Sequence, residues 1–465
     1  MLIGSVTAKA DDVQLNISRA VGEKITVAVN SGITAKLTWA DGSTESFISD
    51  ALPKEFLVKG ESVTLSSDED ITSLYLPDNG ITSISFSASM KTKLCKLYIA
   101  DNELTSLSLM NFSVLKELDC QNNQIATLSL TGSNQLQSLN CANNALTRLT
   151  IPIPAAMVTL ICADNNFTAL SSSQYMVRLA TLFAQNNTFS TLNLSQSVAL
   201  KNLVLSNNAL EAFDASNLSA LKEFWIGKNQ LEKLNLSSSL GIRSLVANDN
   251  SLDSITWNRN TGSDFAYTDL ANNKLYFTSF PTVYNTGLKI YTATANLVPQ
   301  APFKLIANDT LNVNESVNWY ELLRKNGWSA TITTTYALKS AAGNLVEGTD
   351  YTFENRGRKV TFLKAAEDVV LEVSSINYPD ITLTSQPFQV IDPTGIRQVS
   401  EDHPSDVSIS TSPGALYVTL SNAGHLGIYT IAGAQVVNGK YGAGVHAFAL
   451  PSGVYIVNGK KTIIP

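Results

Sequence analysis

Cysteine is the residue type whose spacing most suggests a chemical site. Cys120, Cys141 and Cys162 lie 21 residues apart, and Cys95 precedes them. A zinc site needs ligands that converge tetrahedrally on one point. Repeat spacing instead predicts a line of thiols about 4.8 Å apart, too far for good disulfide geometry. We therefore interpret these cysteines as small buried apolar side chains and expect neither a metal nor a cofactor.

Other residue types that carry catalysis are scarce. The three histidines, His403, His425 and His446, all follow residue 400, and no nucleophile-elbow, phosphate-loop or metalloprotease motif is present. Asp119 and Asp269 are expected to face outward from strands, but about seven repeats separate them. That separation prevents two carboxylates from acting together as acid and base. The sequence therefore predicts a protein that is not an enzyme.

Composition limits the partners. The chain has 465 residues, only 15% of them charged, with a net charge of −7. Nucleic-acid binding by counterion release needs a basic surface, so we expect no nucleic-acid partner. No apolar run approaches the length of about 20 residues that crosses a membrane as a helix, so we also expect no transmembrane segment.

An internal repeat dominates the middle of the chain. A Leu-x-Leu-x-x-Asn pattern returns every 21 to 23 residues and predicts a mostly β solenoid of about ten turns, with little helix. Each Leu-x-Leu should be a short parallel strand. Each Asn should bond backbone groups that the next coil would otherwise leave unpaired. The candidate structural asparagines are Asn79, Asn102, Asn123, Asn144, Asn165, Asn187, Asn208, Asn229, Asn250 and Asn273.

The repeats resemble a known family. Residues 119–130 (DCQNNQIATLSL) and 140–151 (NCANNALTRLTI) are similar to the leucine-rich repeats of secreted and surface proteins of Bacteroidetes. The resemblance covers about 74–280. It implies a leucine-rich-repeat solenoid in an exported or cell-surface protein, and it says nothing about the ligand.

The flanking segments alternate strand-like runs with turns. We expect six parts: an export-signal remnant with the small-x-small site Ala8-Lys9-Ala10 (1–10), an N-terminal β cap (11–70), the solenoid (71–282), an immunoglobulin-like sandwich (297–391), a polar linker (392–406) and a C-terminal β-sandwich (407–465). An ordinary N-terminal strand is the alternative for 1–10.

The C-terminal module contains Gly427-Ile-Tyr-Thr-Ile-Ala-Gly433 and Leu450-Pro-Ser-Gly-Val-Tyr-Ile-Val457. These segments resemble the sorting domain of type IX secretion substrates, which implies export and attachment to the cell surface. A plain β-sandwich without a sorting role remains the alternative.

The residue between the two leucines of each strand should point to solvent on the concave sheet. Five consecutive repeats place an apolar residue there, which predicts an exposed stripe roughly 19 Å long and therefore a contact site. β-Propensity alone is the competing explanation. We predict a protein partner. The alternative is a glycan that stacks on Tyr75, Tyr98, Phe183 and Trp225. The candidate partner-binding residues are Tyr75, Tyr98, Ile161, Phe183, Val204, Trp225 and Val246.

Overall fold

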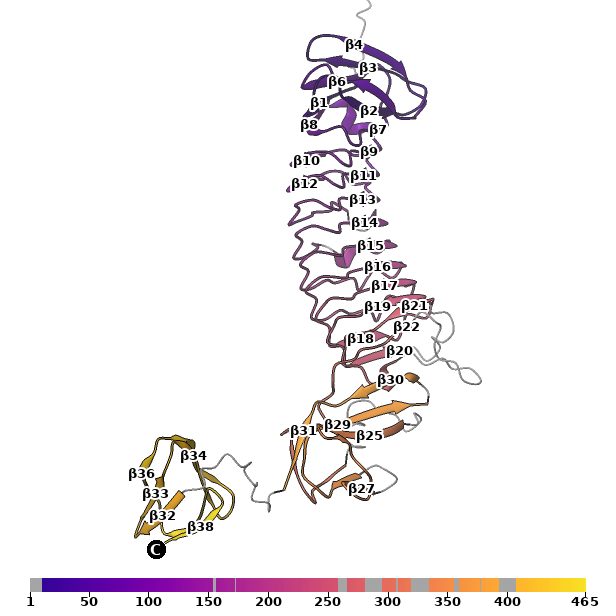
Figure 1. Ribbon diagram of the computed structural model, residues 1–465. Coiled ribbons are helices and arrows are strands. Elements are labelled where there is room, and N and C mark those ends of the chain that lie inside the picture. The colour runs from indigo at the N-terminus through magenta and orange to yellow at the C-terminus, as the bar shows by residue number, and fades with distance from the viewer. Residues whose placement is uncertain are drawn as a thin grey trace, which may run out of the picture. The chain divides into compact units, whose positions relative to one another are not determined.

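The computed structural model describes residues 11–153, 156–171, 173–257, 266–280, 295–306, 308–318, 334–354, 359–376, 378–392 and 407–465 (Figure 1). The expected export-signal remnant (1–10) and all but the first residue of the expected linker (392–406) lie outside these ranges. The described residues fall into two units, and each is described by itself. The first holds 11–303 and, among later residues, 334–336 and 373–384. The second holds 304–318, 337–372 and 385–465.

The N-terminal cap is a five-stranded sheet in the order β4-β3-β6-β1-β8. Alternation explains its core: Ala35, Leu37 and Trp39 of one strand are all buried, and the residues between them face outward. The Trp39 indole N–H donates to Glu45 Oε1 at 3.1 Å. The strands are β1 (Asp11–Ile17), β3 (Thr34–Trp39), β4 (Thr44–Ile48), β6 (Ser62–Ser67) and β8 (Ile81–Phe86).

The solenoid sheet is built from ten in-register parallel strands, which enclose nine complete turns. Its cap-side end is closed by β2 (Lys24–Val29), which pairs antiparallel with the first repeat strand and carries β5 (Lys54–Leu57). At the other end β22 (Ala295–Asn296) continues the sheet. The repeat strands are β7 (Ser73–Tyr75), β9 (Lys96–Tyr98), β11 (Glu117–Asp119), β13 (Ser138–Asn140), β14 (Thr159–Ile161), β15 (Thr181–Phe183), β16 (Asn202–Val204), β17 (Glu223–Trp225), β19 (Ser244–Val246) and β21 (Tyr267–Asp269).

The return side of each coil is mostly extended without pairing. Two parallel pairs form there, β10 (Ser106–Ser108) with β12 (Thr127–Ser129) and β18 (Lys233–Leu236) with β20 (Ser254–Trp257). Helix is limited, among the described residues, to short 3-10 segments: η1 (Ser89–Thr92), η3 (Ser173–Tyr175) and η4 (Phe277–Ser279). The core lies between the two sides, where the inward leucines are almost fully buried. The predicted fold class, a mostly β leucine-rich-repeat solenoid with flanking sheets, is confirmed.

The repeat asparagines join neighbouring coils. Asn229 is 8% exposed, and its Oδ1 accepts the Leu210 N–H at 3.0 Å. Its Nδ2 donates to the carbonyl oxygens of Leu205 and Ile226, each at 3.0 Å, and of Gly227 at 3.3 Å. Leu205 and Leu210 belong to the preceding coil, and Ile226 and Gly227 belong to the coil of Asn229 itself. The side chain therefore satisfies backbone groups at the turn between two coils.

The remaining described strands form smaller sheets. One runs in the order β23-β31-β29-β25-β26 and another in the order β24-β28-β27. Tyr378 of β30 (Tyr378–Thr384) belongs to the first unit, where its ring stacks on Phe277 at 5.4 Å and covers the end of the solenoid core. The other strands are β23 (Thr310–Asn312), β24 (Ser316–Val317), β25 (Thr334–Ser340), β26 (Gly343–Asn344), β27 (Tyr351–Glu354), β28 (Lys359–Phe362), β29 (Ala366–Ser375) and β31 (Phe388–Ile391).

The C-terminal module is a sandwich of a three-stranded sheet, β32-β33-β36, and a four-stranded sheet, β35-β34-β37-β38. Leu416, Val418, Ile428 and Val457 are fully buried in its core. The strands are β32 (Val407–Ser412), β33 (Ala415–Leu420), β34 (Gly424–Thr430), β35 (Gln435–Tyr441), β36 (Gly444–Ala449), β37 (Gly453–Val457) and β38 (Lys460–Ile464).

Candidate binding surface

The strand register places the seven candidate partner-binding residues in one row along the sheet, but in two groups. Tyr75 pairs with Tyr98 at the cap end. Asp119 and Asn140 occupy the next two positions of the row. The second group, which we name the apolar row, then runs without interruption through neighbouring strands. It consists of Ile161, Phe183, Val204, Trp225 and Val246.

The apolar row is unevenly exposed. Trp225 keeps 40% of its surface, whereas Val204 keeps only 9% and is buried. The expected exposure of Val204 is therefore not observed. Phe183 and Trp225, which have larger side chains, lie in register with Val204 on the two neighbouring strands. The Trp225 indole N–H donates to Ser244 Oγ at 3.0 Å. Ser244, the first residue of β19, therefore fixes the orientation of the ring.

The tyrosine pair at the cap end is satisfied within the protein. The Tyr75 and Tyr98 rings stack with centroids 4.4 Å apart and planes 6° from parallel. The Tyr98 hydroxyl donates to Glu117 Oε2, and Glu117 Oε1 forms an ion pair with Lys96 Nζ at 2.9 Å. Burial, together with the Glu117 carboxylate, raises the pKa of Tyr98. The two rings turn a face to each other, so one face of each ring is covered within the protein.

The cysteines form a ladder inside the solenoid. Cys120, Cys141 and Cys162 are fully buried and carry free thiols. Burial raises the pKa of all three thiols, and it raises the pKa of Cys162 to about 12. Neutral, enclosed thiols are poor nucleophiles and poor metal ligands. Cys95 is partly exposed, and its thiol points to the Lys93 carbonyl oxygen at 3.5 Å.

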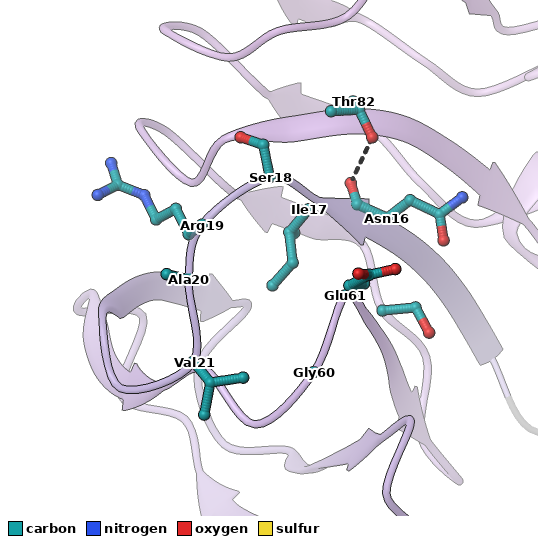
Figure 2. A pocket seen from close by; sticks show the side chains of 10 residues that line it. Asn16, Ile17, Ser18, Arg19, Ala20, Val21, Gly60, Glu61 and Thr82 are labelled. Atoms are coloured by element: carbon teal, nitrogen blue, oxygen red, sulfur yellow. Dashed lines mark hydrogen bonds between the residues drawn. The ribbon is translucent and has the colours of Figure 1, made fainter.

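A shallow pocket of about 550 Å³ lies in the cap (Figure 2). Its lining contains one carboxylate, Glu61, and no histidine or cysteine. The guanidinium of Arg19, at its edge, already donates to the carboxylate of Asp78 at 2.5 Å and to the Asp78 carbonyl oxygen at 2.7 Å. The pocket lining therefore lacks a paired acid and base, and the Arg19 guanidinium is already paired with Asp78.

The described part of the chain holds no cluster of three or more His, Cys, Asp or Glu side chains that could bind a metal ion. His446 Nε2 lies 2.8 Å from the Gly442 carbonyl oxygen, and its ring packs edge-on against Tyr441. His403 lies outside the described residues.

A second polar ladder escaped the sequence analysis. The residue before each repeat asparagine has a left-handed backbone, with φ between +51° and +58°, and nine of these ten residues are Asp or Asn. Asn and Asp tolerate this conformation better than other non-glycine residues. Their exposed side chains bond from coil to coil, as in Asn122 Nδ2 to Asp101 Oδ1 at 2.7 Å and Asn207 Nδ2 to Asn186 Oδ1 at 2.8 Å. Lys228 is the exception. The signal was the recurring Asp-Asn or Asn-Asn pair in the sequence.

The repeated coil geometry decides the fold: in-register Leu-x-Leu strands at 21- to 23-residue intervals, each closed by a buried or half-buried Asn. The chain folds as a leucine-rich-repeat solenoid. No protein-family model matches this leucine-rich-repeat chain, and no curated protein matches it.

Solved structures similar to the chain include the functional domain of InlJ from Listeria monocytogenes, which includes a cysteine ladder, with 16% identity over 71% of this chain and 93% of that one, and a TM-score of 0.29. InlP from the same organism shows 16% identity over 69% and 88%, with a TM-score of 0.37. YopM, a leucine-rich effector protein from Yersinia pestis, shows 20% identity over 44% and 72%, with a TM-score of 0.34.

Proposed function

We propose that this chain is an exported, cell-surface recognition or adhesion protein, not an enzyme, that binds a protein partner through the apolar row of its concave sheet. The observation that carries the proposal is Trp225, 40% exposed within five consecutive in-register apolar positions. Ile161, Phe183 and Val246 are half-buried and Val204 is buried, so the exposed indole is the anchor of the proposed contact. Tryptophan is enriched among the residues that dominate binding energy.

The shape of the row favours a protein over a glycan. Sugars stack on the flat faces of aromatic rings, and the Tyr75–Tyr98 pair uses one face of each ring internally. The apolar row alternates aliphatic and aromatic side chains, and such a surface fits the apolar side chains of a polypeptide. Asn202, Glu223 and Ser244 are the first residues of β16, β17 and β19. We call them the rim residues, and they supply hydrogen-bonding groups beside the apolar row.

The proposal includes the expected organisation of the chain. The segment around Ala8-Lys9-Ala10 would direct export, and the module 407–465 would attach the chain to the cell surface. The cap 11–70 and the segment 297–391 would flank the solenoid 71–282 as separate β domains. No helix among the described residues is long and apolar enough to cross a membrane.

The test compares the full-length chain with its Phe183→Ser/Trp225→Ser variant. Each is immobilised and incubated with the cell-surface protein fraction of the source organism and of candidate hosts. We expect proteins retained by the wild-type chain to bind the variant about 100-fold more weakly or worse, since buried aromatic anchors contribute about 2 kcal/mol or more each.

The matched control is Ile48→Ser/Leu57→Ser, which removes two exposed apolar side chains of the cap, 68% and 52% exposed. It should bind like the wild type, and circular dichroism should show that all three proteins are folded. Equal retention by both double variants would contradict the proposal. Saturable binding of a neutral polysaccharide through Trp225, without any protein partner, would favour the glycan alternative.

A further inference from the structure

Three cations stand on consecutive coils beside the apolar row. Lys201, Lys222 and Arg243 directly precede β16, β17 and β19, and all three are exposed. The Lys222 N–H donates to the Lys201 carbonyl oxygen at 2.8 Å, and the Arg243 N–H donates to the Lys222 carbonyl oxygen at 2.7 Å. These backbone bonds make them neighbouring rungs, about 4.8 Å apart. We name them the basic column.

The basic column is not neutralised by the protein. None of its three side chains forms an ion pair with a carboxylate in the described ranges. Other exposed cations of the same unit, such as Arg148, Lys233 and Lys274, also lack an ion pair in the described ranges, but they do not form a column on consecutive coils. Neighbouring like charges repel one another. In a chain of net charge −7, these three exposed cations therefore form a local positive patch that is complementary to anionic groups.

The basic column and the apolar row follow the same three strands. Each cation is followed by one rim residue, one inward residue and then the row residue: Val204 after Lys201, Trp225 after Lys222, and Val246 after Arg243. The only carboxylate among these three rim residues is Glu223. A partner that covers the exposed indole of Trp225 therefore meets the cations along one side of its contact.

We infer that the partner is a polypeptide segment that presents two or three carboxylates in a line beside apolar side chains, with the carboxylates facing the basic column. This inference rests on the proposed function and adds the chemistry of the partner. The column spans two rungs, about 10 Å. Carboxylates at positions i and i+4 on a helix lie about 6 Å apart along its axis, and those at alternate residues of a strand about 6.8 Å apart, so either pair can face two neighbouring cations of the column. The aliphatic members of the row favour a polypeptide over an anionic polysaccharide.

The experiment selects random 12-residue peptides, displayed on phage, against the full-length chain. The same selection is run against Lys201→Gln/Lys222→Gln/Arg243→Gln. We expect peptides selected on the wild type to be enriched in Asp and Glu beside apolar residues, and peptides selected on the triple variant to lose the acidic excess. A synthetic copy of a selected peptide should bind the triple variant about 10-fold more weakly, as about 0.5 kcal/mol for each exposed ion pair gives.

The matched control is Arg148→Gln/Lys233→Gln/Lys274→Gln, which removes three exposed positive charges outside the column. It should bind the peptide within about 2-fold of the wild type. An equal loss in both triple variants would show a general charge effect and overturn the inference.

The failures of the inference and of the proposed function can be told apart. Peptides that need Phe183 and Trp225 but show no acidic excess overturn the inference and leave the proposed function intact. Peptides that bind equally well to Phe183→Ser/Trp225→Ser overturn both. Binding of alginate, an anionic polysaccharide, through the basic column when no peptide is selected also overturns the inference, because the partner would be a glycan. Selection of no peptide, with no alginate binding, overturns it as well.

Discussion

The two ends of the concave sheet share one backbone and differ in chemistry. At the cap end, Tyr75 and Tyr98 stack on each other, and Lys96 is paired with Glu117. Across β15 to β19 an exposed tryptophan and three unpaired cations face outward. The coils are equivalent in register, so the difference comes from the outward side chains alone. The cap-end side chains are paired with one another, whereas those across β15 to β19 include an exposed ring and cations without an ion pair.

The largest expected effect concerns the repeat asparagines, whose backbone hydrogen bonds are common to both ends of the sheet. Asn102→Ala and Asn229→Ala should each lower the free energy of unfolding by about 3 kcal/mol, because each leaves several buried backbone groups without a partner. Urea denaturation of the full-length chain, followed by tryptophan fluorescence and circular dichroism, measures the loss. Asn217→Ala, at an exposed position of the same solenoid, should change stability by less than about 0.5 kcal/mol. A large loss at one end only would show that the ends differ in backbone architecture.

The next effect separates the ends. A double-mutant cycle on Tyr75→Ala and Tyr98→Ala should give a coupling free energy of about 1 kcal/mol, as expected for a stacked aromatic pair. The same cycle on Phe183→Ala and Trp225→Ala should give a coupling near zero, since their strands are separated by β16. Thermal and urea unfolding supply the four stabilities of each cycle. Similar coupling at both ends would remove the distinction between a satisfied and an open surface.

A smaller effect concerns the outer Asp and Asn ladder, which Lys228 interrupts between Asn207 and Asp249. Lys228→Asn should stabilise the chain by about 0.5 kcal/mol, because asparagine tolerates the φ of +55° at this position and can bond to Asn207. The melting temperature measures the gain. Lys233→Asn, on an exposed strand of the return side, removes the same charge without that backbone requirement. A gain in both variants would mean that charge, not backbone conformation, is responsible.

The smallest effect is a pH dependence confined to the cap end. Hydrogen bonds from Tyr98 and then Lys96 hold the pKa of Glu117 below its ordinary value of 4.5. A lowered folded-state pKa stabilises the chain above the unfolded pKa, and this contribution is lost as the pH falls through the folded pKa. Glu117→Gln should therefore lower the melting temperature slightly at pH 7 and not at pH 2. Glu223→Gln, at an exposed position without an ion pair, should leave the pH 7 value unchanged. A larger loss at pH 2 than at pH 7 would contradict this account.

The sequence predicted the scaffold better than the surface. The spacing of leucines and asparagines fixes which residue of each coil faces inward, so the register of all ten repeat strands followed from it. Alternation also placed Tyr75 through Val246 in one row. Their exposure did not follow, because Val204 is buried between two strands that carry larger side chains and the two tyrosines stack on each other. The exposure of these side chains depends on the size of their neighbours and on contacts between coils. The apolar pattern within a single coil does not encode either.

The sequence analysis did not predict the outer Asp and Asn ladder or the basic column, for a related reason. The outer Asp and Asn ladder and the basic column can be recognised only when the coils are aligned with one another. Neither lies at a position of the apolar repeat pattern. The partner role of the seven row residues and the boundaries of the flanking domains remain predictions. The ten asparagines carry hydrogen bonds that explain their spacing, and Asn79 of the first coil bonds Thr26 of the cap.

The central claim is that the partner contacts the end of the concave sheet between β15 and β19. Site-specific photo-crosslinking tests it most directly. Val246 and Tyr75 are each replaced, in separate full-length variants, by p-benzoylphenylalanine, and each variant is irradiated with the protein retained by the wild-type chain. The account predicts a crosslinked complex from position 246 and none from position 75. Crosslinking from position 75 alone, or equally from both, would contradict it.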